Sequence, residues 1–478
     1  MVINGKKKLL IIGAGCAGQL VLNEIKNHST LNKKYEITGF IDDDPQKINT
    51  KVNSFKILGN QSQLEDIVKK HKVTNIIISI PSATGNQIRK IIDRCINLKV
   101  EIKIVPGIFE IIKGDVFWHQ IRNFKLEDLL GREEVEFDAS YWSRFFQDKN
   151  VLITGAGGSI GESLTKKLLL VNPAKLFLIG RGENSIFKLL QDIKPHKTTQ
   201  IIPIIANIQD KLRLDHILRQ NHIHYLFHTA AHKHVSFMEQ NPTEAVNNNI
   251  IATINLADLS IKHNVERFIF ISTDKAVYPT SIMGISKRIC EIFLLSLAYK
   301  NKKKSNTPNF YIVRFGNVLG SRGSVIKIFQ NQINKGGPIT ITHPEAERFF
   351  MSIAEAAKLL VMVSTMDNKN SMYLLDMGQS IKIKDLALNM IHLSGLKEDS
   401  DIKIEFTKLG EGEKIKEKLV IENENFQPAS ISNILICKNL NTNFNLSIFK
   451  KRINRLRKKI KYKPEKAKIE LKKFLKYY

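Results

Sequence analysis

The segment that decides the fold runs from Arg267 to Arg288 and reads R-F-I-F-I-S-T-D-K-A-V-Y-P-T-S-I-M-G-I-S-K-R. Its first five residues, Arg267 to Ile271, have the pattern of a buried parallel strand, which predicts an α/β sheet. Ser272 to Lys275 follow where this strand ends. In open α/β sheets ligands bind beyond the carboxyl ends of the strands, so these residues are candidates for a functional site.

The composition indicates a globular chain of more than one domain. The 478 residues suffice for two or three domains that each bury a core, and a hydrophobic content of 43% argues against disorder. We find no apolar segment long enough to cross a bilayer, and residues 1–13 lead into a glycine motif instead of a signal-peptide core. We therefore expect a cytoplasmic protein. The four cysteines show no C-x-x-C spacing, which predicts neither disulfides nor a zinc site.

The net charge of +27 is compatible with nucleic acid, anionic lipid or phosphorylated small molecules as partners. We interpret it as a general lysine bias and expect no nucleic-acid partner. Positive charge is densest from Lys450 to Lys476, a region broken at Pro464. We expect residues 446–478 to form a solvated basic tail, with peripheral contact to the inner face of an anionic membrane as the alternative.

Residues 1–125 are predicted to form a first nucleotide-fold domain. Strand Lys8–Ile12 leads into G-A-G-C-A-G and a helical pattern, so this G-x-G-x-x-G loop is placed to approach a phosphate. Strand Ile37–Ile41 ends in Asp42, Asp43 and Asp44, where dinucleotide folds carry their ribose-binding acid. A ligand-binding domain and a scaffold without ligand both fit this pattern. Further helices and strands are predicted at Leu64–His71, Val73–Ile80, Gln87–Leu98 and Val100–Val105.

Residues 126–149 are interpreted as a linker with a short helix, and residues 150–445 as a larger second domain. Strand Val151–Thr154 leads into G-A-G-G-S-I-G and an apolar helix through Leu170. Glycines three apart after threonine are the form used by short-chain dehydrogenases and their extended relatives. The predicted fold class is α/β with two Rossmann-like domains, the second with a small C-terminal substrate-binding part. The candidate cofactor residues of this loop are Gly155, Gly158, Ser159, Ile160 and Gly161.

Later strand ends supply further candidate cofactor contacts. Strand Lys175–Ile179 is followed by Arg181, whose guanidinium suits the 2′-phosphate of NADP, so NADP is slightly favoured over NAD; a solvated loop residue is the alternative. His232 and His234 lack a carboxylate or cysteine at ligand spacing, and we expect no metal. The remaining candidate cofactor residues are Asn207, Ile208, Ala230, Ala231, Lys233 and Asn248.

The catalytic pattern departs from the Tyr-x-x-x-Lys of ordinary short-chain dehydrogenases. Lys287 occupies the lysine position, but Met283 stands in the tyrosine position, and a thioether neither donates nor accepts a proton usefully. An active enzyme must then take its acid and base from elsewhere, and Asp274 and Lys275 are the candidates. An inactive enzyme is the other interpretation, which this neighbouring pair disfavours.

Three extended motifs occur in a fixed order along the chain. T-G-A-G-G-S-I-G comes first, H-T-A-A-H-K-H-V-x-x-M-E-x-N-P second, and S-T-D-K-A-V-x-P-T-x-x-M-G-x-S-K-R third. Together they resemble the CapD-like nucleotide-sugar 4,6-dehydratases, and most closely the PglF/WbpM-type enzymes of bacterial glycan synthesis. Met283 matches the methionine of that family. Further matching segments, which extend the resemblance over nearly the whole chain, are Leu129–Val135, Arg314–Val325, Gly336–Pro344 and Gly410–Lys414.

This resemblance implies a redox-neutral dehydration of UDP-N-acetylglucosamine to a UDP-4-keto-6-deoxy sugar, with the configuration at C5 retained, for glycan or polysaccharide biosynthesis. Bound NAD(P)+ would take hydride from C4 and return it to C6. Lys275 would be the base at C5, and Asp274 the acid for the departing C6 hydroxyl. Thr273 would hydrogen-bond near the 4-hydroxyl, and Lys287 would hold the nicotinamide ribose.

The resemblance also implies substrate contacts. A UDP-N-acetylhexosamine is the expected substrate, and we expect a homo-oligomer. Arg348 is the candidate diphosphate clamp, because a guanidinium fork matches phosphate oxygens. The other implied contacts are His234, Asn317, Arg322, Ser324, Val325, Thr342 and Glu413.

The sequence departs from the family pattern in three respects. The transmembrane helices that usually precede the first domain do not occur in this sequence, so we expect either a naturally soluble protein or a shortened form. Asn207 stands where relatives commonly have aspartate, and Tyr278 where many have asparagine. Two other functions stay open. A UDP-sugar 4-epimerase would normally keep the tyrosine and lack the Asp-Lys pair, and a non-catalytic nucleotide-sugar-binding scaffold would use both nucleotide folds without turnover.

Overall fold

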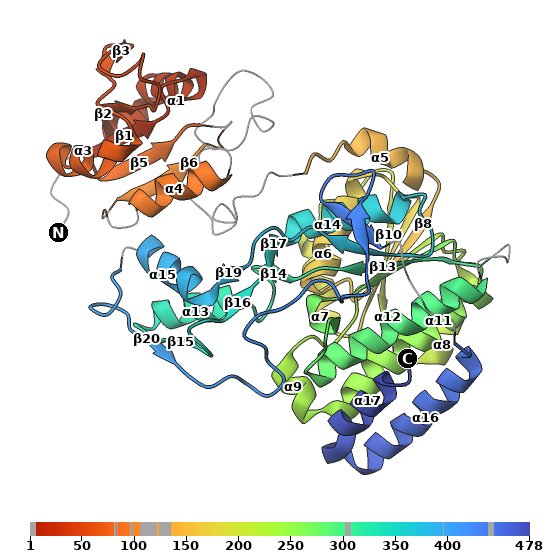
Figure 1. Cartoon of the computed structure of the whole chain (residues 1–478). Coiled ribbons are helices and arrows are strands. Elements are labelled where there is room, and N and C mark those ends of the chain that lie inside the picture. The colour runs from red at the N-terminus through yellow and green to blue at the C-terminus, as the bar shows by residue number, and fades with distance from the viewer. Residues whose placement is uncertain are drawn as a thin grey trace. The chain divides into compact units, whose positions relative to one another are not determined.

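The chain divides into two compact units. One comprises Met1–Glu133, Gln332–Ile339 and Leu386–Ile404, and the other comprises Glu134–Asn331, Thr340–Asp385 and Glu405–Tyr478 (Figure 1). The predicted boundaries after residues 125, 149 and 445 stay predictions. The computed structural model describes residues 6–80, 83, 85–95, 98, 100–105, 122–123, 135–301, 307–394, 396–437 and 444–478.

The first unit contains a twisted sheet with helices on both faces. Its elements are β1 (Lys7–Ile12), α1 (Cys16–Asn27), α2 (Ser29–Lys34), β2 (Tyr35–Ile41), β3 (Lys51–Val52), β4 (Phe55–Lys56), α3 (Leu64–His71), β5 (Asn75–Ile78), α4 (Gly85–Cys95), β6 (Glu101–Ile104) and β7 (Arg122–Asn123). The strand order is β2-β1-β5-β6-β7, parallel except for β7. Successive residues of a strand face opposite sides, so Leu9 and Ile11 pack with α1, whereas Leu10 and Ile12 pack with α3 and α4. The predicted first nucleotide fold is confirmed.

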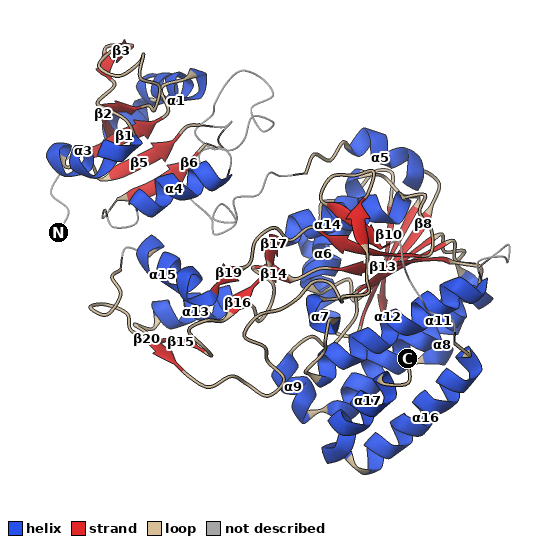
Figure 2. Cartoon of the chain, in the orientation of Figure 1, coloured by secondary structure: helices blue, strands red, loops and turns tan. Residues whose placement is uncertain are grey.

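The second unit is built on a nine-stranded sheet (Figure 2). Its strands are β8 (Asn150–Thr154), β9 (Lys175–Gly180), β10 (Gln200–Ile205), β11 (Tyr225–His228), β12 (Arg267–Ile271), β13 (Asn309–Arg314), β18 (Ser371–Leu375), β21 (Phe426–Pro428) and β22 (Ile434–Cys437). The order is β10-β9-β8-β11-β12-β13-β18-β22-β21, and the first seven strands are parallel. This arrangement confirms the predicted α/β class with a second, larger Rossmann-like domain.

Helices cover both faces of this sheet. They are α5 (Ala139–Phe146), α6 (Ser159–Leu170), α7 (Glu183–Asp192), α8 (Lys211–Gln220), α9 (Val235–Gln240), α10 (Pro242–Glu244), α11 (Ala252–Lys262), α12 (Ile282–Asn301) and α14 (Ile353–Thr365). The apolar alternation of β12 divides them, because Phe268 and Phe270 pack with α8, α11 and α12, whereas Ile269 packs with α5, α6, α7 and α14. Strand β12, with which the segment Arg267 to Arg288 begins, thus lies buried between two layers of helices.

Short elements follow β13 and precede the end of the sheet. They are β14 (Asn317–Leu319), α13 (Val325–Asn334), β15 (Ile339–Ile341), β16 (Glu347–Arg348), β17 (Phe350–Ser352), β19 (Ile381–Lys382), α15 (Ile383–Leu393) and β20 (Ile404–Phe406). Strand β14 pairs with β17 in parallel, and β16 pairs with β19 antiparallel. The small substrate-binding part stays a prediction.

The C-terminal segment is a folded part of the second unit, and the prediction of a solvated tail was wrong. It forms α16 (Leu446–Tyr462) and α17 (Ala467–Leu475), which pack against α12. Phe449, Ile453, Leu456 and Ile460 recur every three or four residues and are buried. This spacing gives α16 one apolar face for the core and leaves its basic residues on the other face.

Between α10 and α11 the backbone forms a π-helical segment, Ala245–Ile251. Of the predicted linker 126–149, residues 126–134 lie outside the described residues, and α5 supplies its helix. In the parts of the chain that the structure describes, no helix is long and apolar enough to cross a membrane.

Candidate active site

The floor of the site forms where β12 ends. Thr273 caps a short helical turn, Asp274–Ala276, and its side chain accepts a hydrogen bond from the Lys275 N–H at 3.4 Å. The turn directs Asp274 inward, where its side chain is fully buried, and keeps Lys275 at 20% exposure. A carboxylate out of contact with water needs partners that compensate its charge.

Asp274 and Lys275 are in direct contact. The Oδ1 atom of Asp274 accepts hydrogen bonds from the Thr273 hydroxyl at 2.8 Å and from the Lys275 ammonium at 3.0 Å. The Lys275 ammonium also donates to Oδ1 of Asn317, on β14, at 2.9 Å. The other carboxylate oxygen, Oδ2 of Asp274, is buried and has no hydrogen-bond partner among the described residues. A buried oxygen without a partner is unusual, and this one is left with a free acceptor position next to Lys275.

A buried glutamate lies on the other side of Lys275. Glu417 Oε1 is 3.7 Å from the Lys275 ammonium, and Glu417 Oε2 is 3.0 Å from the Lys414 ammonium. Lys414 also donates to the carbonyl of Val277 at 2.7 Å, which ties its segment to the catalytic turn. Lys275 thus lies between two acids and an amide oxygen that fix its position.

Met283 and Lys287 lie on α12 beneath the site. Met283 is 3% exposed and packs in the core, as its apolar side chain dictates. The Lys287 ammonium donates to the carbonyl of Ile271 at 2.8 Å and lies 4.5 Å from the centre of the Phe270 ring. Burial lowers the pKa of Lys287 to about 8, against a partial opposing effect of Cys290 and Glu291.

A buried ion-pair network fixes the elements that carry these residues. Glu291, on α12, accepts hydrogen bonds from the Ser272 hydroxyl at 2.7 Å and from Arg314, at the end of β13, at 2.9 Å. Arg314 also binds Glu424 at 2.7 Å, and Arg288 binds both glutamates. Burial alone would raise the pKa of Glu291, but the charges of Arg314 and Arg288 outweigh the effect of burial, so the pKa is lowered. The network joins β12, β13 and α12 next to the catalytic turn.

The glycine loop between β8 and α6 has the form of a phosphate cradle. Gly155 adopts a φ of +71°, and a Cβ there would lie 2.8 Å from the backbone of Ala230. Gly158 precedes α6 without a side-chain cap on the helix, so amides of its first turn are left for a ligand. A larger residue would fill this space. The loop therefore fits the diphosphate of a dinucleotide.

Other candidate cofactor residues lie along the same strand ends. Ser159 Oγ accepts the Arg322 N–H at 3.0 Å, and Lys233 donates to Ser321 Oγ at 3.2 Å, so the loop after β14 is bonded to both. Partial burial and then the charges of Lys327 and Lys275 lower the pKa of Lys233. Arg181 is exposed after β9. Ile208 and Asn248 are buried, whereas Asn207, Ile160, Ala230 and Ala231 are half-buried.

The candidate substrate residues are held by several loops. Asn317 contacts Lys275 directly, and the Ser324 hydroxyl is buried without a partner among the described residues. Arg348 Nη1 donates to the carbonyls of Glu347 and Ile415 at 2.8 and 3.0 Å. Glu413 Oε2 accepts the Gly410 N–H at 3.2 Å. Neither Arg348 nor Glu413 contacts the Asp274–Lys275 pair. Val325 begins α13, Thr342 follows β15, and His234 lies against Gly323.

Tyr278 shows how the site accommodates one departure from the family pattern. It adopts a φ of +43°, a left-handed conformation that asparagine takes far more readily than an aromatic residue. Its hydroxyl accepts the Glu422 N–H at 3.0 Å. This bond gives the tyrosine a structural role in holding the segment next to Glu424.

Comparison with known proteins identifies the family. The profile of the family described as polysaccharide biosynthesis protein matches residues 151–439, which is more than half of the chain. The chain belongs to this family. A second profile, described as a CoA-binding domain, matches residues 2–106.

Individual relatives agree with this membership. The capsular polysaccharide biosynthesis protein CapD of Staphylococcus aureus is 40% identical over 88% of this chain and 69% of its own. A protein named UDP-glucose 4-epimerase from Rickettsia rickettsii is 32% identical over 58% of this chain and 80% of its own. The X-ray structure of Pen from Bacillus thuringiensis superposes with a TM-score of 0.56 and 34% identity, over 61% of this chain and 90% of that one. The chain is thus a CapD-type, nucleotide-sugar-modifying member of the extended short-chain dehydrogenases.

Sequence reasoning missed the charged residues that surround the Asp274–Lys275 pair of this CapD-type protein. Glu417, Glu291 and Glu424 carry no motif spacing to the catalytic turn and meet it only in the fold. Arg314 and Lys414 lie in segments that match the family, but no pattern indicates their partners. The one available signal is the isolated Glu291 within the apolar run of α12, where a charge must be paired.

Proposed function

We propose that this protein is a UDP-N-acetylglucosamine 4,6-dehydratase that produces a UDP-4-keto-6-deoxy-N-acetylhexosamine and water, with retention at C5, for bacterial glycan or polysaccharide biosynthesis. The observation that carries the proposal is the contact of buried Asp274 with Lys275 at 3.0 Å, where Oδ2 of Asp274 has no hydrogen-bond partner among the described residues. Met283 leaves the usual tyrosine position without a proton donor, so proton transfer falls to this pair.

A bound nicotinamide dinucleotide would supply a reversible two-electron oxidation of the sugar that begins at C4 and is reversed at C6. The glycine loop from Gly155 to Gly161 would hold its diphosphate, since a side chain at Gly155 would collide with Ala230. Lys287 would hold the nicotinamide ribose through its ammonium, which the carbonyl of Ile271 already orients. NADP is slightly favoured because Arg181 is exposed where a 2′-phosphate would lie.

Lys275 and Asp274 divide the proton transfers. Oxidation at C4 acidifies the proton on C5, and Lys275 takes it once its ammonium has passed a proton to Asp274 across their contact. Protonated Asp274 gives its proton from Oδ2 to the C6 hydroxyl, which leaves as water. The 4-hydroxyl also loses its proton when C4 is oxidised, and C5 regains a proton once C6 is reduced. Two protons are thus taken from the sugar and two are given, one of which leaves in the water, and the 3.0 Å contact between the two residues lets a proton pass from Lys275 to Asp274 before each turnover. Asn317 and Glu417 keep the Lys275 amine aimed during both steps.

Substrate binding is assigned to the loops around this pair. Arg348 uses one nitrogen for the carbonyls of Glu347 and Ile415, and its remaining guanidinium donors suit the diphosphate of a UDP-sugar. The buried hydroxyl of Ser324 is a donor without a partner in the described structure, which suits a sugar or phosphate oxygen. Thr273 contacts Asp274 and would hydrogen-bond near the 4-hydroxyl. His234, Arg322, Val325, Thr342 and Glu413 complete the proposed set.

The test is NMR and mass spectrometry of UDP-N-acetylglucosamine incubated with the pure full chain in D2O, without an added reductant. The product should have lost one water, carry deuterium at C5 and keep the C5 configuration. An unchanged substrate would refute the dehydratase. Inversion at C5 with loss of water would leave the dehydratase and reject retention.

A UDP-sugar 4-epimerase is the second candidate, because the Rickettsia relative carries that name. Its product would have the same mass as the substrate, which separates it from the dehydratase in one measurement. Met283 and the Asp274–Lys275 contact speak against it. A scaffold would bind the UDP-sugar without any turnover. The expected homo-oligomer and the membrane contact of the basic helices stay predictions.

A further inference from the structure

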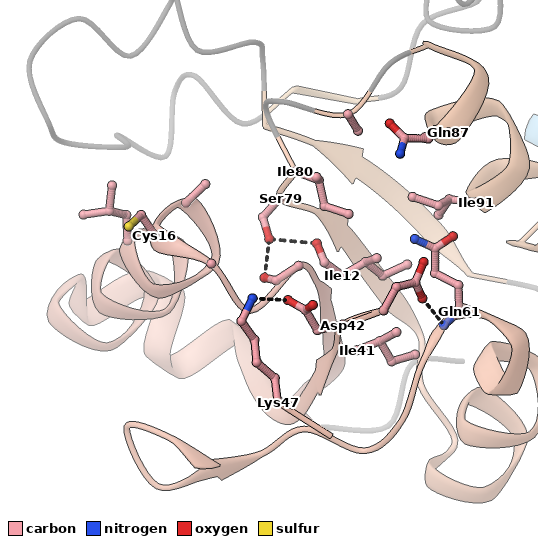
Figure 3. Close-up of a pocket in the computed structure, with 16 residues that line it drawn as sticks. Ile12, Cys16, Ile41, Asp42, Lys47, Gln61, Ser79, Ile80, Gln87 and Ile91 are labelled. Atoms are coloured by element: carbon pink, nitrogen blue, oxygen red, sulfur yellow. Dashed lines mark hydrogen bonds and ion pairs between the residues drawn. The ribbon is translucent and has the colours of Figure 1, made fainter. Parts of the chain in front are cut away.

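The first unit contains a cavity of about 550 Å³ at the carboxyl end of its sheet (Figure 3). The glycine loop after β1, the residues after β2 and the residues after β5 line it. Gly13, at a φ of +99°, lies so close to Ser79 that a Cβ would come within 2.7 Å of the Ser79 carbonyl oxygen. A Cβ at Gly15, which also lines the cavity, would meet nothing within 4 Å. The cavity thus begins at Gly15, where a phosphate would meet the loop.

Two residues build this loop and are not available to a ligand. The carboxylate of Asp42 accepts the Ala14 N–H at 2.8 Å and the Asp44 N–H at 3.0 Å. Ser79 donates its hydroxyl to the carbonyls of Ile12 and Gly13 at 2.9 and 3.0 Å, and Figure 3 shows both bonds as dashed lines from Ser79. Both oxygens of Asp42 therefore accept hydrogen bonds from backbone N–H groups. Asp42, the first acid after β2, thus stabilises the loop.

Asp43 is the acid that remains for a ligand. It lines the cavity, and its Oδ1 accepts the Gln61 N–H at 2.8 Å. Its other oxygen has no hydrogen-bond partner in the described parts of the chain. An acid at this place in a dinucleotide fold accepts hydrogen bonds from the hydroxyls of a ribose. Asp43 therefore supplies the acceptor that a free ribose diol needs.

The charge at this edge disfavours a phosphorylated ribose. Among the described residues that line the cavity or pair with its acids, one cation, Lys47, accompanies Asp42, Asp43 and Asp44, and it lies 3.6 Å from Asp42 and 3.3 Å from Asp44. The hydrogen bond to Asp44 and the charge of Asp42 raise the pKa of Lys47, so it stays a cation bound to these acids. Three carboxylates against one ammonium leave a net charge of −2. A phosphate on the ribose would be repelled there.

We propose that this cavity binds a nucleoside diphosphate whose ribose hydroxyls are free, and that it discriminates against nucleotides with a phosphorylated ribose. Coenzyme A, after which the matching domain family is described, carries a phosphate on the 3′ carbon of its ribose. The residues of this chain thus assign the domain a ligand of the ADP-ribose or UDP-sugar type. The site is separate from the proposed dehydratase chemistry and does not depend on it.

The test compares 3′-dephospho-coenzyme A with coenzyme A, because the two differ only in that phosphate. Binding to the full chain is measured by calorimetry for wild type and for Gly15→Glu, which places a carboxylate in the open space at the phosphate position. Binding that wild type shows and Gly15→Glu lacks is assigned to this cavity. In this component of the binding, dephospho-coenzyme A should bind at least about tenfold more tightly than coenzyme A. Asn27→Glu, which adds the same charge at the exposed last residue of α1, outside the cavity lining, is the matched control and should keep the binding.

Asp43→Asn tests the ribose recognition itself. The amide keeps an acceptor for the Gln61 N–H but removes the negative charge, so the preference for dephospho-coenzyme A should fall to about threefold or less. ADP-ribose and UDP-N-acetylglucosamine, measured in the same way, distinguish an adenosine from a uridine ligand. Equal or tighter binding of coenzyme A to the cavity overturns the proposal. So does the absence of any binding component that Gly15→Glu removes.

Discussion

The acidic segments after β2 and after β12 both follow the carboxyl end of a parallel strand, in two different sheets of one chain, yet they differ in burial. After β2, Asp43 is exposed and Asp44 pairs with Lys47 at 3.3 Å, at 40% and 42% side-chain exposure. After β12, Asp274 is fully buried and pairs with Lys275 at 3.0 Å. An exposed ion pair exchanges its protons and partners with water, whereas a buried one reacts only with what enters its site. Burial, and not the presence of an acid next to a lysine, distinguishes the proposed catalytic strand end from the binding one.

The largest expected effect comes from the base of the buried pair. Lys275→Met keeps the length of the side chain and removes its amine, so turnover of UDP-N-acetylglucosamine should fall by about 10³-fold or more. The measurement is product formation by mass spectrometry at saturating substrate. Lys166→Met, at an exposed i,i+4 pair with Glu162 on α6, is the control and should keep turnover within about twofold. If Lys275→Met keeps its turnover, the buried pair is not catalytic, and burial does not distinguish the strand end after β12 from the one after β2.

The second prediction concerns the stability that burial demands. Arg314→Met leaves Glu291 and Glu424 buried without their main cation, and should lower the free energy of unfolding of the second unit by about 3–5 kcal/mol. In the first unit Lys7 pairs with Glu101 at 48% and 42% side-chain exposure, so Lys7→Met should cost less than about 1 kcal/mol. Urea unfolding of the full chain, followed by circular dichroism, measures both. A loss below about 1 kcal/mol for Arg314→Met would show that the network does not support the site.

Much of the fold can be predicted from local patterns. Strand β12 and helix α3 begin and end at the predicted residues, because a compact apolar run and an amphipathic repeat each suffice to define them. Both glycine loops follow from their spacing. The C-terminal helices were misjudged because their many basic residues mask an apolar face that includes Phe449 and Leu456. An apolar stripe predicts packing only when another surface is known to receive it.

The site was predictable only where its residues adjoin one another in sequence. Asp274 and Lys275 are neighbours, so the end of a strand was enough to select them. Glu417 reaches Lys275 across a large separation in sequence, and Arg314 joins β13 to α12 through Glu291. These contacts depend on the order of strands in the sheet, which a single sequence with no aligned relatives does not determine. Residue type alone also did not reveal that the Oδ2 atom of Asp274 lacks a partner.

The third prediction uses the lowered pKa of Lys287. Its pKa is about 8 in the folded protein and near its ordinary value of 10.5 in the unfolded chain. Between these values the unfolded chain binds the additional proton, so stability should rise with pH, by at most about 3 kcal/mol for this group. Activity should change in the opposite direction, because Lys287 loses above pH 8 the charge that would hold the ribose. The pKa of Lys47 is raised instead of lowered, so this group gives no pH range in which stability rises with pH.

The measurement compares wild type with Lys287→Met, so that other groups which titrate in this range cancel. Urea unfolding at pH 7.5 and pH 10 should show a gain in wild type that the variant lacks. The pH profile of turnover in wild type should fall through about pH 8. A wild-type gain equal to that of the variant would mean that the ammonium is not desolvated in solution.

The smallest expected effect compares the two ribose sites. Asp43 follows the second strand of the first sheet, and Arg181 follows the corresponding strand, β9, of the second. If the acid suits a free ribose diol and the guanidinium a phosphorylated one, Arg181→Ala should weaken NADP+ binding by about tenfold and change NAD+ binding by less than about twofold. Calorimetry of the full chain with each dinucleotide measures the ratio, and Arg181→Asp should shift it further toward NAD+. If Arg181→Ala leaves the ratio unchanged, Arg181 is a solvated loop residue, and the choice of cofactor lies in the loop from Gly155 to Gly161 and not at the strand end.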